Sequence, residues 1–157
     1  MLLLPELSVY ITHTCTLACD SCCTFNHLNW GTHFKPDTTK EKLKALPDTV
    51  DFEEVFIIGG EPTSNPALGD WMAYLESMWP NAKKWVVTNG RDLDKFDELY
   101  PEWIDRDWKI EISAHSQQDL DTVMSWIHNR WADVSCERFK DTRHEDGEWH
   151  YKLVVDG

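Results

Sequence analysis

The sequence lacks long apolar runs, has few basic residues and shows no export signal. Its 15 lysines and arginines are outnumbered by 28 aspartates and glutamates, so the formal net charge is −13 at pH 7. This excess of acid disfavours binding to a phosphate backbone, and we expect no nucleic-acid partner. The apolar start Met1–Leu4 is too short for a signal peptide and has no basic residue. No stretch reaches the roughly 20 apolar residues of a membrane helix. The sequence therefore predicts a cytoplasmic protein that does not enter the membrane.

The chain also lacks repeats, low-complexity segments and linkers, and its 157 residues are the length of one domain. Short β-branched runs alternate with segments of helical periodicity. We expect strands near 7–11, 55–58, 85–87 and 108–114, and helices that begin near Thr38, Pro66, Asp92 and Leu120. This alternation is typical of parallel α/β folds. In such folds the reactive groups gather at the carboxyl ends of the strands.

Local signals add detail to this plan. Asp92 is placed to cap the helix that follows it. Residues 134–139 and 149–155 flank the turn pair Asp146-Gly147, which indicates a hairpin. Four of the nine tryptophans fall in helical patterns and are expected to pack in the core: Trp71, Trp79, Trp126 and Trp131.

The most specific motif is a set of three cysteines. Cys15, Cys19 and Cys22 have the spacing C-x3-C-x2-C. Three thiolates can hold a four-iron cluster by three corners and leave the fourth iron open for chemistry. Thiolates are soft ligands, so the alternatives are zinc or Cu(I).

Zinc would need a fourth ligand, because its structural sites are four-coordinate. The available side chains are His13, His27 and the distant Cys136, since Cys23 directly follows Cys22 and is poorly placed. A disulfide is disfavoured in a reducing compartment. An open iron–sulfur site is the favoured interpretation, while zinc and purely structural cysteines stay open.

A second motif follows the second predicted strand. The run Val55–Ile58 ends in Gly59-Gly60-Glu61-Pro62. Two glycines allow a ligand to approach the backbone closely, and the Glu61 carboxylate could hold an ammonium group. A side chain at Gly60 is accordingly expected to block the ligand and to leave a metal site intact.

Together these residues resemble the radical SAM (radical S-adenosylmethionine) superfamily, in which a C-x3-C-x2-C loop follows the first strand and Gly-Gly-Glu-Pro follows the second. The resemblance implies a partial (β/α) barrel formed by residues 1–157 and short or truncated at its C-terminal side. It implies a [4Fe–4S] cluster on Cys15, Cys19 and Cys22, with S-adenosylmethionine bound to the fourth iron. It also implies a set of cofactor-binding residues: Gly59, Gly60, Glu61, Pro62, Asn89, Ser113 and His115.

The implied activity is reductive cleavage of S-adenosylmethionine to a 5′-deoxyadenosyl radical, which removes a hydrogen atom from a substrate. The resemblance implies an electron donor and a substrate, either a small molecule or a protein, that no motif names. Ser21 stands where the family usually has an aromatic residue, and Phe25 or Trp30 could replace it in packing the adenine. Two alternatives remain: an activase for a glycyl-radical enzyme, and a non-catalytic iron–sulfur or zinc module.

Overall fold

The molecule is built on one six-stranded sheet. The computed structural model describes residues 1–19, 22, 31–103, 105–129, 135–140 and 149–155. The strand order is β1-β2-β3-β4-β6-β5. The strands are β1 (Leu2–Tyr10), β2 (Val50–Ile58), β3 (Lys83–Thr88), β4 (Trp108–Ala114), β5 (Ser135–Lys140) and β6 (Trp149–Val155). The first four pair in parallel, whereas β6 pairs antiparallel with both β4 and β5.

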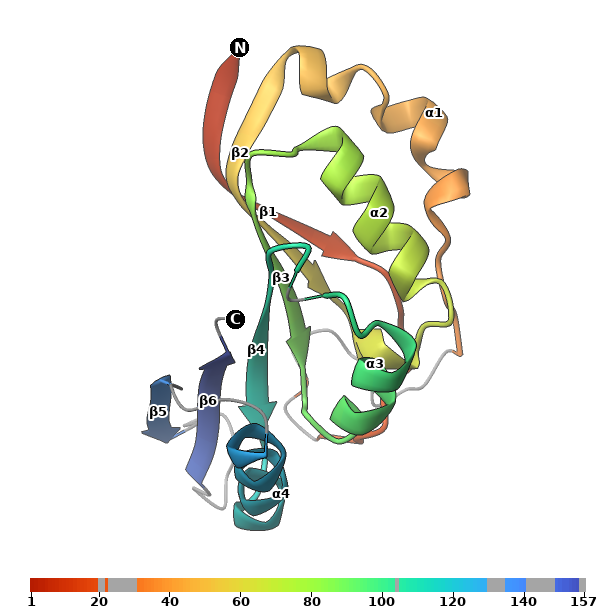
Figure 1. The fold of residues 1–157 in the computed structure, drawn as a ribbon. Coiled ribbons are helices and arrows are strands. Elements are labelled where there is room, and N and C mark those ends of the chain that lie inside the picture. The colour runs from red at the N-terminus through yellow and green to blue at the C-terminus, as the bar shows by residue number, and fades with distance from the viewer. Residues whose placement is uncertain (20–21, 23–30, 104, 130–134, 141–148, 156–157) are drawn as a thin grey trace.

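Three of the helices connect the parallel strands, and the fourth follows β4. They are α1 (Lys40–Leu43), α2 (Leu68–Met78), α3 (Leu93–Leu99) and α4 (Gln117–His128), with short 3-10 turns η2 (Pro36–Thr38), η3 (Leu46–Asp48) and η4 (Pro62–Ser64). Helices α1, α2 and α3 lie on one side of the sheet (Figure 1). This arrangement confirms the α/β class and the partial (β/α) barrel, whose parallel part consists of β1 to β4. Within the described residues no helix is long and apolar enough to cross a membrane.

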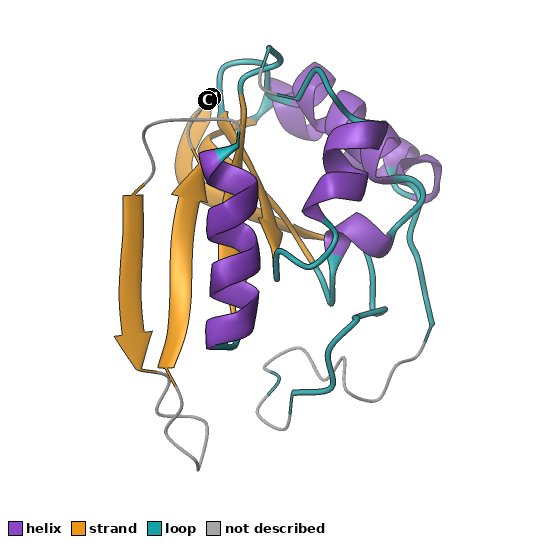
Figure 2. Ribbon diagram, turned by 60° about the horizontal axis from the view of Figure 1, so that its bottom comes forward, coloured by secondary structure: helices purple, strands orange, loops and turns teal. Residues whose placement is uncertain are grey.

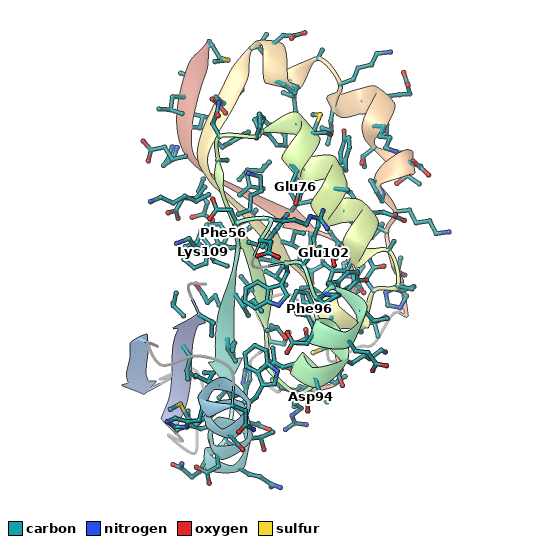
Figure 3. All side chains as sticks on the ribbon, viewed as in Figure 1. Phe56, Glu76, Asp94, Phe96, Glu102 and Lys109 are labelled. Atoms are coloured by element: carbon teal, nitrogen blue, oxygen red, sulfur yellow. The ribbon has the colours of Figure 1, made fainter. Side chains whose placement is uncertain are left out.

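The core lies between the sheet and its helices. Strand β4 alternates strictly, with Trp108, Ile110, Ile112 and Ala114 at most 1% exposed and the residues between them half-buried. Successive side chains of a strand point to opposite faces, so the half-buried set lies on the face without helices. Figure 3 shows Phe56 and Lys109 on that uncovered side and Glu76 on the helical side.

Three of the four tryptophans that the sequence predicts in the core are found there. Trp71, Trp79 and Trp126 are at most 5% exposed, whereas Trp131 lies outside the described residues. Buried indoles usually find a hydrogen-bond partner. Here the Trp71 indole N–H donates to the Phe34 carbonyl (2.8 Å), and that of Trp79 donates to the Val50 carbonyl (3.1 Å). These bonds anchor α2 to the segments beside it.

The C-terminal hairpin is confirmed by the antiparallel pairing of β5 with β6, although the pair Asp146-Gly147 is outside the described residues. Figure 2 shows these two strands at one edge of the sheet. The prediction for Asp92 is wrong in one respect. Asp92 precedes α3, but its side chain makes no capping bond. A different helix, α4, does have a side-chain cap: Ser116 accepts a hydrogen bond from the Asp119 amide at 3.1 Å.

Strand β1 also differs from its prediction, because it begins at Leu2 rather than near Leu7. The residues before Leu7 pair with the start of β2, from Leu2 opposite Val50 to Leu4 opposite Phe52. This added length comes from pairing between strands, which the local alternation of the sequence does not show.

Candidate functional site

The site lies where the four parallel strands end. Tyr10 pairs with Ile58, Ile57 with Val86, and Thr88 with Ile112. The carboxyl ends of β1 to β4 therefore lie side by side, and the edge of the sheet that they form runs across the strands. The cysteine loop, which contains Cys15, Cys19 and Cys22, follows β1. Gly59–Pro62 follow β2, Asn89 follows β3 and His115 follows β4. The structure thus brings together at one edge the segments that the sequence singles out.

The two ends of the cysteine loop meet at Ile11 and Phe34, which we call its neck. The Phe34 amide donates to the Ile11 carbonyl at 2.9 Å. The Asn65 side-chain amide donates to the Ile11 carbonyl (2.8 Å) and to the Phe34 carbonyl (3.0 Å). Asn65 is 1% exposed, so this clamp is part of the core. In the sequence, the only signal for Asn65 is its place in the turn between Pro62 and Pro66, and this signal does not identify it as a site residue.

Just inside the neck, the two sides of the loop pair with each other. Thr12 and His33 form an isolated antiparallel bridge, and their side chains meet at 2.9 Å between Thr12 Oγ1 and His33 Nδ1. The Thr12 hydroxyl also donates to the Thr32 carbonyl at 3.1 Å. The His13 ring packs against Tyr10 and Phe34, with ring centroids 5.1 and 5.4 Å apart. His13 therefore has a packing role at the neck.

The glycine pair faces the cysteine loop. The Gly60 amide donates to the Thr12 carbonyl (2.9 Å), and the Glu61 amide donates to the Thr14 carbonyl (2.8 Å). A Cβ on Gly59 would lie 2.7 Å from the Thr12 carbonyl oxygen. A Cβ on Gly60 would overlap the Thr14 carbonyl and lie 3.0 Å from the Cβ of Cys15.

The structure adds a second consequence to the expectation for Gly60. A side chain there would push on the backbone that leads into Cys15, so we expect it to disturb a metal site on the loop as well as the approach of a ligand. Gly60 lacks a side chain chiefly because the cysteine loop lies directly against the end of β2 at this residue. Such contacts between segments distant in sequence cannot be read from a Gly-Gly pair alone.

Glu61 is a fully buried carboxylate. Its Oε1 accepts from the Thr63 amide (3.1 Å), the Thr63 hydroxyl (2.7 Å) and the Thr88 hydroxyl (2.7 Å). Its Oε2 accepts from the Asn89 amide at 2.7 Å. Burial raises the pKa of this carboxyl group, while the hydrogen bonds act in the opposite direction. Glu61 thus joins the end of β2 to the end of β3.

Asn89 extends this connection to the cysteine loop. Its side-chain amide donates to the Thr16 hydroxyl at 2.9 Å, and its side-chain oxygen accepts from the Arg91 amide at 3.1 Å. Thr16 directly follows Cys15, so the end of β3 holds the loop next to its first cysteine. Ser113 and His115 are half-buried at the end of β4, and Ser113 alternates with the buried Ile112 and so lies on the uncovered face.

Cys15, Cys19 and Cys22 are half-buried cysteines that form no disulfide. The Cys22 amide donates to the Cys19 carbonyl at 3.2 Å, which forms a turn. Burial raises the pKa of the Cys15 thiol, a hydrogen bond from the Leu17 amide lowers it, and Glu61 and Cys22 raise it further. Among the described residues no three His, Cys, Asp or Glu side chains are gathered closely enough to hold a metal ion.

Two observations nevertheless fit a metal–sulfur group at this loop. The donor set is three soft ligands on one short segment, and a ligating thiol loses its proton on binding. The Thr14 hydroxyl oxygen, next to Cys15, is buried and has no hydrogen-bond partner within the described part of the chain. A buried polar atom without a partner calls for an explanation, and a bound ion or water is one of them.

The remaining candidate residues from the sequence are either not described by the structure or lie away from this site. Ser21, Cys23, Phe25, His27 and Trp30 lie outside the described residues. Cys136 lies in β5, at the opposite edge of the sheet from β1 and its cysteine loop. This placement disfavours Cys136 as a fourth ligand.

The chain was compared with known proteins. A family model described as the radical SAM superfamily matches residues 9–138, which is most of the chain. No curated protein matches it. The matched residues include the cysteine loop, the Gly59–Pro62 segment and the ends of β3 and β4. The chain therefore belongs to the radical SAM superfamily.

Proposed function

We propose that this radical SAM enzyme forms one core domain over residues 1–157 and binds a [4Fe–4S] cluster through Cys15, Cys19 and Cys22. The observation that carries the proposal is the attachment of the cysteine loop to the ends of β2 and β3. Backbone bonds from Gly60 and Glu61 hold the loop on one side. The bond from Asn89 holds it on the other. The bound cluster would supply the electron for reductive cleavage of S-adenosylmethionine, which is the chemistry of the family.

We place S-adenosylmethionine at the same edge of the sheet, against Gly59–Pro62, Asn89, Ser113 and His115. The Glu61 carboxylate already accepts four hydrogen bonds from the protein. Its part is therefore to fix the strand ends that surround the proposed cofactor position. Asn89 acts in the same way, because both ends of its side-chain amide bind the protein.

The uncovered face of the sheet is the approach for a substrate. It carries Phe56 and Trp85, whose rings stack with centroids 5.6 Å apart, and the Lys109 ammonium lies 5.5 Å from the centre of the Trp85 ring. An electron donor is the other partner that the chemistry requires. A reducing compartment such as the cytoplasm suits cysteines that form no disulfide.

The test is anaerobic reconstitution with iron and sulfide, followed by metal analysis and product analysis. The parent protein should bind about four irons and four sulfides, and with a strong reductant it should cleave S-adenosylmethionine. Alanine at Cys15, Cys19 or Cys22 should abolish cluster binding and cleavage. The matched controls Cys23→Ala and Cys136→Ala should keep both. Stoichiometric zinc in the fresh protein, with no cluster after reconstitution, would contradict the proposal.

A further inference from the structure

Thr14 has both of its backbone polar groups in use. Its amide donates to the Thr12 hydroxyl at 3.0 Å, and its carbonyl accepts from the Glu61 amide at 2.8 Å. The Cα of Gly60 packs against that carbonyl so closely that no Cβ fits between them. The residue before Cys15 is therefore held in one place from both sides.

The hydroxyl of Thr14 contrasts with the other threonine hydroxyls around the site. Those of Thr12, Thr63 and Thr88 donate to protein acceptors, and that of Thr16 accepts from Asn89. Thr14 Oγ1 is buried and has no partner among the residues that the structure describes. A hydroxyl is a donor that rotates to suit its acceptor. The unused donor thus lies beside the first cysteine of the motif.

We propose that the Thr14 hydroxyl donates a hydrogen bond to a sulfur of the iron–sulfur cluster and thereby raises the reduction potential of the cluster. This inference rests on the proposed cluster site. Reduction adds negative charge to the cluster, and a donor to sulfur stabilises that charge. Residues around a metal centre tune it through such bonds.

The cofactor is the other possible acceptor, because S-adenosylmethionine carries a carboxylate. The structure favours the cluster. Thr14 is joined directly to Cys15, and a Cβ built on Gly60 would meet the Thr14 carbonyl and the Cys15 Cβ together. The hydroxyl therefore belongs to the same short segment as a proposed ligand. A donor to the cluster acts with or without the cofactor, and this property separates the two acceptors.

The experiment is a redox titration of the reconstituted protein in the absence of S-adenosylmethionine, followed by the electron paramagnetic resonance signal of the reduced cluster. Thr14→Val keeps the shape and removes the donor. It should make reduction less favourable by up to about tenfold, which is about 59 mV for one electron. Thr14→Ser should restore the parent potential. The control Thr122→Val removes a hydroxyl on α4 that donates to the Gln118 carbonyl, and it should leave the potential unchanged.

The outcomes separate this inference from the proposed function. If the parent binds no cluster, the cluster site fails and the donor fails with it. If Thr14→Val binds a full cluster at the parent potential, only the donor is overturned. The same conclusion holds if that variant weakens S-adenosylmethionine binding alone. If Thr14→Val binds no cluster, binding by Thr14→Ser but not by Thr14→Ala would support the hydroxyl. Failure of Thr14→Ser as well would overturn it.

Discussion

Two regions of this molecule use carboxylates in different ways. At the strand ends, Glu61 is fully buried and all four of its hydrogen-bond donors are neutral groups. On the helical side, Glu76 of α2 is 30% exposed in its side chain. It accepts from the Arg106 guanidinium at 2.9 Å through both oxygens and from the Trp108 indole at 2.6 Å. One carboxylate is balanced by a cation, whereas the other depends on hydroxyls and amides.

The difference follows from what each region joins. Glu76 connects a helix to the segment before β4, where water is near and a long cation can reach. Asp97 of α3 joins further segments on this side, because its two oxygens accept from the Trp103 and Trp126 indoles, both at 3.0 Å. Glu61 connects two strand ends that also hold the cysteine loop, and its donors there are two backbone amides and two threonine hydroxyls. At the strand ends, loss of Glu61 therefore removes the acceptor of two buried groups, those of Thr88 and Asn89. Loss of Glu76 removes the acceptor of one buried group, the Trp108 indole, and of a partly exposed guanidinium.

Replacing each glutamate by leucine should separate the two regions most clearly. Glu61→Leu leaves the donors of Thr88 and Asn89 buried without their acceptor, and it also removes the partner of the half-buried Thr63. Each buried group costs about 1–3 kcal/mol, so we expect a loss of at least about 2 kcal/mol in the free energy of unfolding. Glu76→Leu should cost about 1–2 kcal/mol, because the Arg106 side chain is 25% exposed and can bind water. Urea unfolding of both reduced variants without metal is the measurement.

Equal losses for the two glutamates would contradict the comparison. Glu61→Gln is the matched control, since it keeps one oxygen acceptor and the shape of the side chain. It should lose less stability than Glu61→Leu, because only one of the two oxygens becomes a donor group.

The two regions also differ in how they would accept a side chain on glycine. Gly60→Ala places its Cβ against the Thr14 backbone, and overpacking costs about 1–3 kcal/mol. In α2, a Cβ on Gly69 would lie 2.6 Å from the Tyr100 ring, which is a side chain that can move. Gly69→Ala also gains about 1 kcal/mol of helix propensity, so it should be close to neutral.

Reconstitution of the two alanine variants checks this difference further. Gly60→Ala should bind less iron than the parent, whereas Gly69→Ala should bind the same amount. A Gly60→Ala protein with full cluster and parent stability would show that the loop can move away from the strand end at no cost.

Much of the fold was predictable because its signals are local. The alternation in β4 and the periodicity of α2 are properties of consecutive residues, and both elements are present. The strand-end positions of Cys15, Gly60 and Asn89 were also predictable, since parallel strands end at one edge of a sheet. The burial of Glu61 and the clamp by Asn65 were not. They depend on contacts between segments 28 and 54 residues apart in the chain, which leave no periodic pattern.

The smallest expected effect concerns a buried cation on the helical side. Lys84 of β3 is 6% exposed, and its ammonium donates to the carbonyls of Ala82 (2.7 Å) and Pro80 (3.1 Å). Burial lowers the pKa of Lys84, while the charges of Glu76 and Asp107 act in the opposite direction. The unfolded chain therefore binds more protons than the folded chain between this lowered pKa and the usual value of about 10.4. Stability from this group rises with pH across that window.

Lys84→Met removes the titration, so the stability of the parent relative to this variant should increase as the pH is raised toward 10.4. Urea unfolding of both proteins at a series of alkaline pH values measures this. A constant difference would mean that the two carbonyls and the nearby acids fully replace the water that Lys84 loses on folding.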